Sequence, residues 1–115
     1  MNSVQISSHK DGGIVTVYLS GQALDASNVQ RFRHDTATMF DSEKFFVFVL
    51  KDLKFVDSSG IGALLSCLRK AHANGGDVKL AEVPDNVKSL FELVRMDRLF
   101  EIFPTKEDAA VTFRS

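Results

Sequence analysis

The chain has 115 residues, of which 44% are hydrophobic and 25% charged. This size and balance suit one compact domain, residues 1–115, and argue against a disordered chain. The formal net charge of -1 argues against direct nucleic-acid binding, which needs a surplus of Lys and Arg. No apolar run has the length of a membrane span, and the N-terminus lacks a signal peptide's apolar region. We therefore expect a cytoplasmic protein without membrane insertion.

The N-terminal residues have the pattern of a β-hairpin. Val4 and Ile6 alternate with polar residues, which is typical of an edge-like strand. The stretch KDGG at 10–13 is a turn signal, and GIVTVYLSG at 13–21 alternates again. We expect the two strands to pair with each other.

A change of period then predicts a helix within residues 24–40, LDASNVQRFRHDTATMF, that starts after Asp25 or Ser27 as its N-cap. The run FFVFVL at 45–50 follows. It is apolar without a break and rich in residues that favour strands. Such a run is typical of a central strand that is covered on both faces.

A second helix is predicted over residues 59–74, and it begins within the polar stretch DSSG at 57–60. His72 extends its apolar face, and NGG at 74–76 can end the helix with a left-handed residue. The residues that recur at the spacing of one buried helix face are Ile61, Leu64, Leu65 and Leu68.

The C-terminal third predicts two more strand–helix units. DVKLAEV at 77–83 is a short strand, and Pro84 begins a third helix, because a proline in the first turn loses no hydrogen bond. Residues 99–104 predict a last short strand. Residues 105–113 predict a final helix with Thr105 as its cap.

The order of these elements predicts the fold class. Strands that alternate with helices indicate an α/β fold with a mixed, mostly parallel sheet of four to five strands and about four helices. Function in such sheets usually lies where strands end and helices begin. The stretch KFVDSSGIGALL at 54–65 is a junction of this kind.

The residues of this junction allow two interpretations. Ser and Asp are the preferred helix N-caps, and a cap stabilises a helix by about 1 kcal/mol. The free N–H groups at a helix start also favour an anion, so the fold would accept a phosphate on Ser58 or Ser59 there. Gly60 and Gly62 would then leave room for the active site of another chain. The pattern alone does not decide between the two.

The stretch VDSSGIGALL resembles the signature of the STAS domain family, in particular the bacterial anti-sigma factor antagonists. Two further stretches are similar to that family, VYLSGQALDASNVQRF and the C-terminal half from GGDVKLAEV to KEDAA, so the resemblance covers nearly the whole chain. The loop GQALDAS departs from the common GELD and removes one acid. The signature is an acid, a phosphorylatable Ser, a Ser or Thr, Gly, an aliphatic residue and Gly, which matches Asp57, Ser58, Ser59, Gly60, Ile61 and Gly62.

The resemblance implies a STAS-like domain that acts as a partner switch. A serine-kinase anti-sigma factor, or a related switch kinase, phosphorylates Ser58, and a PP2C-type phosphatase removes the phosphate. The unphosphorylated domain binds the kinase and releases the kinase's target. The domain itself is a phosphoprotein, a monomer or weak dimer, and neither an enzyme nor a cofactor binder. The alternative is a STAS accessory subunit of a membrane lipid or anion transport system.

Other residues of the expected site keep two interpretations each. Asp25 caps the first helix or, as the resemblance implies, lies near Ser58 and orients it or contacts the kinase. Ser59 is either phosphorylated itself or, as the family pattern and cap preference favour, a second cap or a hydrogen-bonding neighbour. Besides residues 60–62, the partner surface would include Ser66 and Arg69, for which a solvated helix face is the plainer explanation.

The sequence has no pattern for catalysis or metal binding. His9, His34 and His72 show no ligand spacing with Cys67 or a carboxylate. As the single cysteine, Cys67 cannot form an internal disulfide. Ser58 has no Lys or His nearby in sequence to activate it, and no phosphate-binding glycine loop is present.

Overall fold

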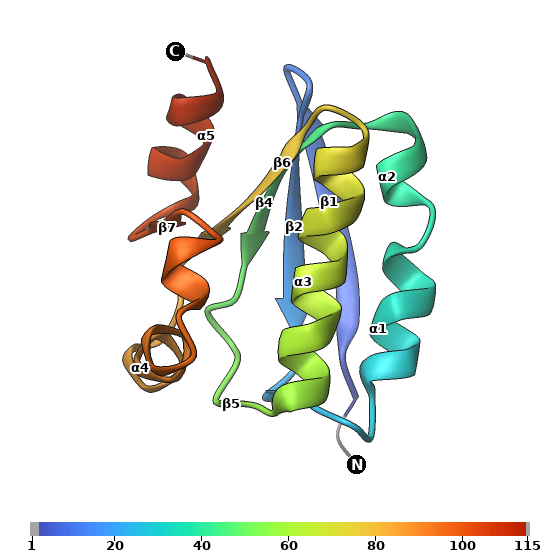
Figure 1. The fold of residues 1–115 in the computed structure, drawn as a ribbon. Coiled ribbons are helices and arrows are strands. Elements are labelled where there is room, and N and C mark those ends of the chain that lie inside the picture. Colours follow the sequence, from blue (N-terminus) through green and yellow to red (C-terminus); the bar gives the residue numbers. More distant parts are fainter. Residues whose placement is uncertain (1–2, 115) are drawn as a thin grey trace.

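The computed structural model describes residues 3–114 and is built on a five-stranded mixed sheet (Figure 1). Its strand order is β1-β2-β4-β6-β7, and only the β1–β2 pair is antiparallel. This confirms the expected α/β class with a mostly parallel sheet. The five strands are β1 (Gln5–Asp11), β2 (Ile14–Ser20), β4 (Phe45–Val49), β6 (Asp77–Ala81) and β7 (Ile102–Phe103).

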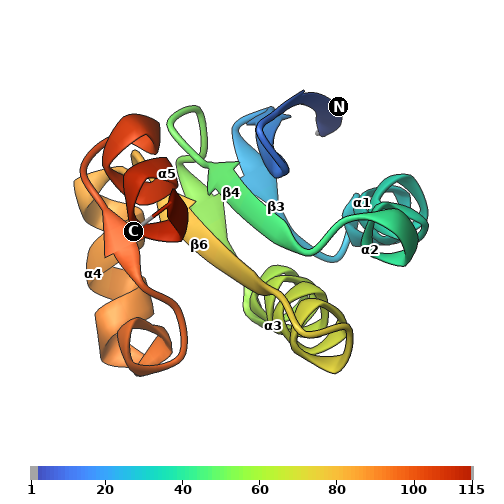
Figure 2. The ribbon, with the colours of Figure 1, turned by 90° about the horizontal axis from the view of Figure 1, so that it is seen from above.

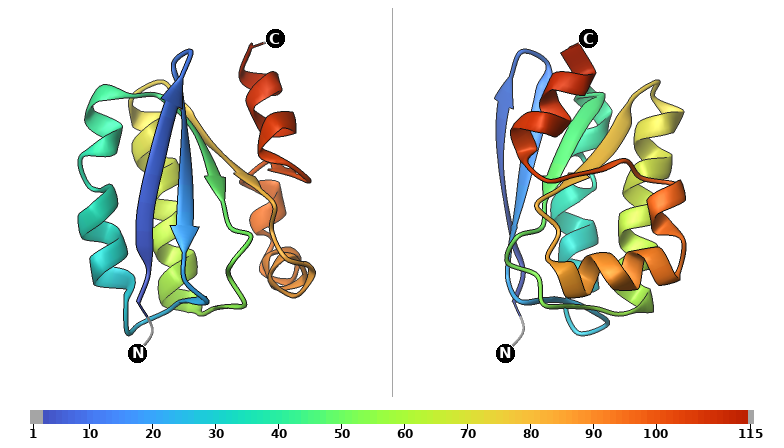
Figure 3. Two further views of the ribbon diagram at one scale, coloured as in Figure 1. Left: turned by 180° about the vertical axis from the view of Figure 1, so that it is seen from behind. Right: turned by 90° about the vertical axis from the view of Figure 1, so that its left-hand side faces the viewer.

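Helices cover both faces of the sheet. Four of them have eight or more residues: α1 (Val29–Thr36), α3 (Ser58–Ala73), α4 (Asp85–Leu93) and α5 (Lys106–Arg114). α1 and α3 lie side by side on one face, with the short α2 (Met39–Ser42) after α1 (Figures 1 and 2). α5 lies on the opposite face, and α4 with the 3-10 turn η1 (Met96–Arg98) lies at the edge (Figure 3).

The central strand β4 contributes side chains to two hydrophobic cores, one on each face of the sheet. Successive side chains of a strand point to opposite faces, so Phe46 and Phe48 join the core under α1 and α3. Val47 and Val49 join a smaller core under α5. All four side chains are buried, which confirms the expected central strand.

The N-terminal hairpin is also confirmed. Its register pairs Gln5 with Ser20 and Asp11 with Ile14. Gly12 and Gly13 form the turn with φ angles of 59° and 81°, a conformation that L side chains rarely adopt. Further along the chain, Gly75 (φ 79°) follows α3 as expected.

The expected single helix over residues 24–40 is wrong. Leu24 instead belongs to β3 (Ala23–Leu24), which pairs in parallel with β5 (Phe55–Val56), and two residues separate α1 from α2. Asn28 takes the N-cap position of α1, without a capping side-chain bond. It instead donates to the Ala23 carbonyl, so neither Asp25 nor Ser27 is the N-cap. A two-residue strand is too short to show a period, and the sequence pattern therefore missed it.

The buried face of α3 is rotated from the expected one. Ile61 and Leu65 are only half-buried, and His72 is exposed, with its Nε2 3.0 Å from an Asp77 carboxylate oxygen. Small residues let the helix lie close to the sheet, and a count of large apolar residues overlooks them. The buried positions are Gly60, Ala63, Leu64, Cys67, Leu68 and Ala71.

The remaining C-terminal elements follow the sequence pattern closely. Pro84 is the N-cap of α4 rather than its first residue. Thr105 caps α5 as expected, because its Oγ1 accepts the N–H of Asp108 at 3.0 Å. The last strand is confined to Ile102–Phe103.

Candidate functional site

The candidate site is the junction at which β5 ends and α3 begins. Asp57 is the N-cap of α3 and has an extended backbone. Its Oδ1 accepts the N–H of Gly60 and its Oδ2 accepts the N–H of Ala26, both at 3.0 Å. The Asp57 carboxylate thus joins the first turn of α3 to the loop that follows β3.

The same contacts keep Asp57 charged. The N–H of Gly60 has the largest effect and holds the pKa of the Asp57 carboxyl below its ordinary value, against a smaller effect of burial that raises it. The N–H groups of Ala26 and Ser59 also lower this pKa. Hydrogen bonds to a carboxylate favour its charged form. A fixed negative charge therefore lies directly before Ser58.

Neither serine of the junction caps the helix. Ser58 is the first residue of α3 and is exposed, and its hydroxyl has no hydrogen-bond partner within residues 3–114. Ser59 is half-buried, and it contributes a backbone N–H rather than its hydroxyl. Of the two interpretations of Ser59, the second cap is wrong because Asp57 takes that position, whereas its backbone N–H does make it a hydrogen-bonding neighbour of Asp57. The Ser58 hydroxyl is accessible as a consequence.

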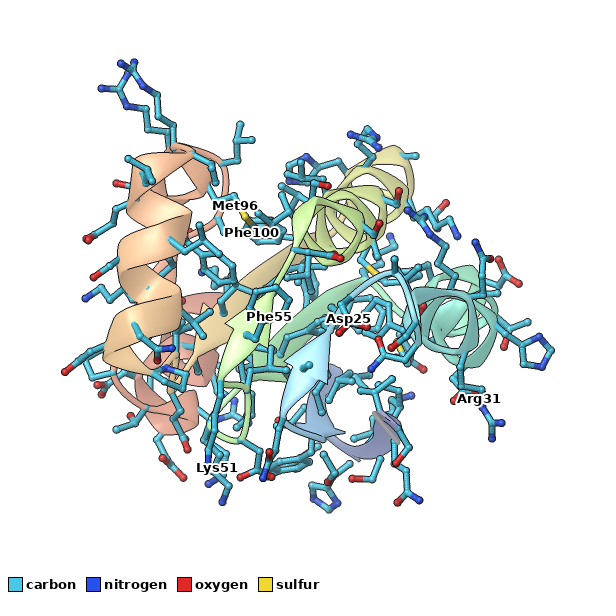
Figure 4. All side chains as sticks on the ribbon, turned by 90° about the horizontal axis from the view of Figure 1, so that it is seen from below. Asp25, Arg31, Lys51, Phe55, Met96 and Phe100 are labelled. Carbon is cyan, nitrogen blue, oxygen red and sulfur yellow. The ribbon has the colours of Figure 1, made fainter. Side chains whose placement is uncertain are left out.

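The structure brings Asp25 to this junction. β3 and β5 pair in parallel up to Leu24 and Val56, so Asp25 lies one residue beyond that pair, as Asp57 does. Asp25 Oδ1 accepts the N–H of Ser27 at 2.9 Å and its hydroxyl at 2.5 Å. Asp25 thus shapes the turn before α1, and Figure 4 shows it at the same end of the molecule as Phe55 of β5. A contact of Asp25 with a kinase stays a prediction.

The two glycines of the motif have different surroundings. A Cβ on Gly60 would lie 2.3 Å from the Leu24 carbonyl oxygen and 2.9 Å from Val56 Cγ1. Gly60 is buried, and its missing side chain lets α3 pack on the strand pair. A Cβ on Gly62 would meet only Arg33, at 3.8 Å from Nη2. Gly62 thus leaves space for an approaching chain, whereas Gly60 lets α3 pack closely on Leu24 and Val56.

A polar cluster continues the exposed side of α3. The half-buried Ser66 hydroxyl donates to the Gly62 carbonyl at 3.0 Å. It accepts from Arg33 Nη1 at 3.1 Å and from Arg69 Nη2 at 3.4 Å. Arg69 is exposed as expected, but Ser66 is not part of a solvated face. The sequence pattern missed Arg33, because it lies on α1, and contacts between two helices leave no local spacing.

Burial makes Cys67 an unreactive thiol. It raises the pKa of Cys67 to about 11, against a hydrogen bond from Thr36 that lowers it. Within residues 3–114, no three His, Cys, Asp or Glu side chains gather closely enough to hold a metal ion. In the same part of the chain, no helix combines the length and hydrophobicity of a membrane span.

The fold is shared with known proteins. The chain is 33% identical over 104 residues to the anti-sigma F factor antagonist of Paenibacillus polymyxa, covering 89% of this chain and 86% of that one. The phosphorylated form of the Bacillus cell fate determinant SpoIIAA is similar with a TM-score of 0.71, 22% identity and coverage of 96% and 98%. The murine anion transporter SLC26A9 is similar with a TM-score of 0.76 and 21% identity, over 90% of this chain and 18% of the transporter.

A protein-family model matches almost the whole range of the helices and strands. The model of the STAS domain matches residues 5–109, from the first residue of β1 into α5. The matched range includes the Asp57 cap and both glycines of the motif. The chain therefore belongs to the STAS domain family.

Proposed function

We propose that this protein is an anti-sigma factor antagonist-like regulator, switched by phosphorylation of Ser58 in the cytoplasm. Its unphosphorylated form binds a serine-kinase anti-sigma factor or a related switch kinase, which then releases its own target. The observation that carries the proposal is the accessible Ser58 hydroxyl, left without a structural role because Asp57 caps α3. The 33% identity to an anti-sigma F factor antagonist supports it.

The chemistry of the switch belongs to the partners. The kinase transfers the γ-phosphoryl group of ATP to the Ser58 oxygen, and ADP and the hydroxyl proton leave. A PP2C-type phosphatase hydrolyses the phosphoserine to serine and inorganic phosphate. In this reaction the STAS domain supplies only the acceptor, which agrees with a regulatory rather than a catalytic protein.

The phosphate acts on binding through charge. It adds about -1.5 to -2 charges beside the Asp57 carboxylate, which is already held ionised. Burying this cluster in an interface costs desolvation and like-charge repulsion. A loss of about 3 kcal/mol would weaken binding roughly a hundredfold.

The proposed partner surface surrounds Ser58 on α3. Ile61 and the open position at Gly62 lie in the next turn, with Ser66 and Arg69 beyond them. Asp25 lies at the edge of the same junction. Gly60 supports the surface from beneath, because it is packed against Leu24.

A matched pair of variants tests the proposed acceptor. The protein is incubated with candidate switch kinases and ATP, and its mass is measured intact and after digestion. We expect a gain of one phosphate that Ser58→Ala abolishes and Ser59→Ala retains. A phosphate that persists in Ser58→Ala would contradict the proposal.

The similarity to a domain of an anion transporter supports a second candidate, an accessory subunit of a membrane lipid or anion transport system. Such a subunit would form a stable complex with a transporter component and would need no phosphorylation. Co-purification from membranes in equal amounts of the wild type, Ser58→Ala and Ser58→Asp would favour this candidate over the switch.

A further inference from the structure

Arg33 and Arg69 form a cationic pair without a counter-charge. Both guanidinium groups donate to the Ser66 hydroxyl, at 3.1 Å and 3.4 Å, and this acceptor is neutral. Within residues 3–114, neither arginine forms an ion pair with a carboxylate. Two like charges on one neutral acceptor repel each other. An anion at this position would therefore be stabilised.

Arg31, two residues earlier on α1, is a contrast on the same helix. Its Nε lies 3.0 Å from a carboxylate oxygen of Asp35. Figure 4 shows its side chain on the outer side of α1, directed away from α3. The helix thus carries one arginine with a carboxylate partner and one, Arg33, that faces α3 without such a partner.

Arg33 lies beside Gly62, one helical turn after Ser58. Its Nη2 is 3.8 Å from the place where a Cβ of Gly62 would be. Residues four apart on a helix have Cβ positions about 5–6 Å from each other on one face, and Ser58 is four residues before Gly62. α1 and α3 run side by side over this stretch (Figure 1). Because Gly62 has no side chain, nothing at that position separates the guanidinium from Ser58.

The start of α3 has fewer free backbone N–H donors for a phosphate than an uncapped helix N-terminus has. The Asp57 carboxylate already accepts the N–H of Gly60, and the Ser59 N–H also acts on it. The same carboxylate repels a phosphate on the next residue, and Asp25 adds another acidic group at this junction. A cation on a neighbouring element would therefore stabilise the phosphate, and Arg33 is placed to supply it.

We propose that Arg33 leaves Ser66 and binds the phosphate of phosphorylated Ser58. This rests on the proposed function. Ser66 then remains the acceptor of Arg69. The Arg33 side chain, drawn across Gly62, covers the open position on the partner surface. Phosphorylation thus blocks the partner by an internal ion pair that fills this gap, in addition to its charge.

The test needs no kinase, because phosphoserine can be installed at position 58 during translation. Phosphorus NMR then follows the second dissociation of the phosphate, which has an ordinary pKa of about 6. A guanidinium in contact favours the dianion and lowers this pKa. We expect phosphorylated Arg33→Gln to have a pKa about 0.5 unit above that of the phosphorylated wild type.

Arg31→Gln is the matched control. It removes the same charge from the same helix at a residue that pairs with Asp35, so we expect a shift well below that of Arg33→Gln. Equal shifts in both variants would overturn the proposal, because Arg33 would then act only through the overall charge. A phosphate pKa unchanged in Arg33→Gln would overturn it as well.

A second measurement uses the wild-type sequence alone. On phosphorylation at position 58, the guanidinium NMR signals of Arg33 should move and those of Arg31 should stay. Unmoved Arg33 signals would contradict the ion pair even if Arg33→Gln fails to fold. The proposed function is judged separately, by whether a switch kinase modifies Ser58, so the two can fail independently.

Discussion

Within residues 3–114, α3 and α5 begin with a side chain that accepts a backbone N–H of the first turn, and the two caps use different chemistry. At the start of α5, the hydroxyl of Thr105 accepts the N–H of Asp108 at 3.0 Å. At the start of α3, the carboxylate of Asp57 accepts the N–H of Gly60, and the hydroxyl of Ser58 has no such task. A serine at a helix start is thus free for modification when the residue before it caps the helix.

The largest expected effect concerns the packing beneath the α3 start. Gly60→Ala would place a Cβ 2.3 Å from the Leu24 carbonyl oxygen, so the helix would have to move from its strand. We expect a loss of about 3 kcal/mol or more in the free energy of unfolding, measured by urea denaturation.

Gly62→Ala is the matched control for this variant. Its Cβ would meet only Arg33 at 3.8 Å, and alanine favours a helix interior by up to about 1 kcal/mol over glycine. We expect unchanged or slightly raised stability. Equal losses at the two glycines would contradict the different roles assigned to them.

The comparison of the two caps is tested by removing each hydroxyl. Thr105→Ala removes the side-chain cap of α5, and we expect a loss of about 1 kcal/mol. Ser58→Ala removes a hydroxyl without a partner, so its change should stay within about 0.5 kcal/mol. Thermal and urea unfolding of both variants measure this difference. A loss in Ser58→Ala as large as that in Thr105→Ala would show that the serine supports the fold.

The smallest expected effect is the pH dependence of the Asp57 cap. The pKa of Asp57 is lower in the folded state than its ordinary value of about 3.9. A lowered pKa adds stability that is fully present above this ordinary value and is lost as the pH falls through the folded-state pKa. Asp57→Asn keeps a capping side chain but not the charge.

Urea midpoints between about pH 5 and pH 2 measure this effect. We expect the wild type to lose more stability over this window than Asp57→Asn does. Identical slopes for the two proteins would contradict a carboxylate held ionised by the helix start.

The sequence predicted the junction between β5 and α3 better than the structure around it. The motif from Asp57 to Gly62 is a local pattern, and such patterns can be recognised in a sequence. It carried the family resemblance and predicted the start of α3 to within one residue. The short pair β3–β5 was missed, because two residues show no period. The role of Gly60 depends on the Leu24 carbonyl, which is far away in the sequence.

The contact between Arg33 and Ser66 was missed for a related reason. The two residues are 33 positions apart and lie on different helices. Only the packing of α1 against α3 brings them together. A pattern within one helix does not indicate which residue of another helix Arg33 contacts.

The most direct test of the central claim is a calorimetric binding titration with the switch kinase that modifies the protein. It compares the unmodified protein with protein that carries phosphoserine at position 58, after circular dichroism has shown that both are folded. We predict that the phosphorylated protein binds roughly a hundredfold more weakly or more so. Equal affinities of the two folded proteins would contradict a switch in which phosphorylation of Ser58 blocks partner binding.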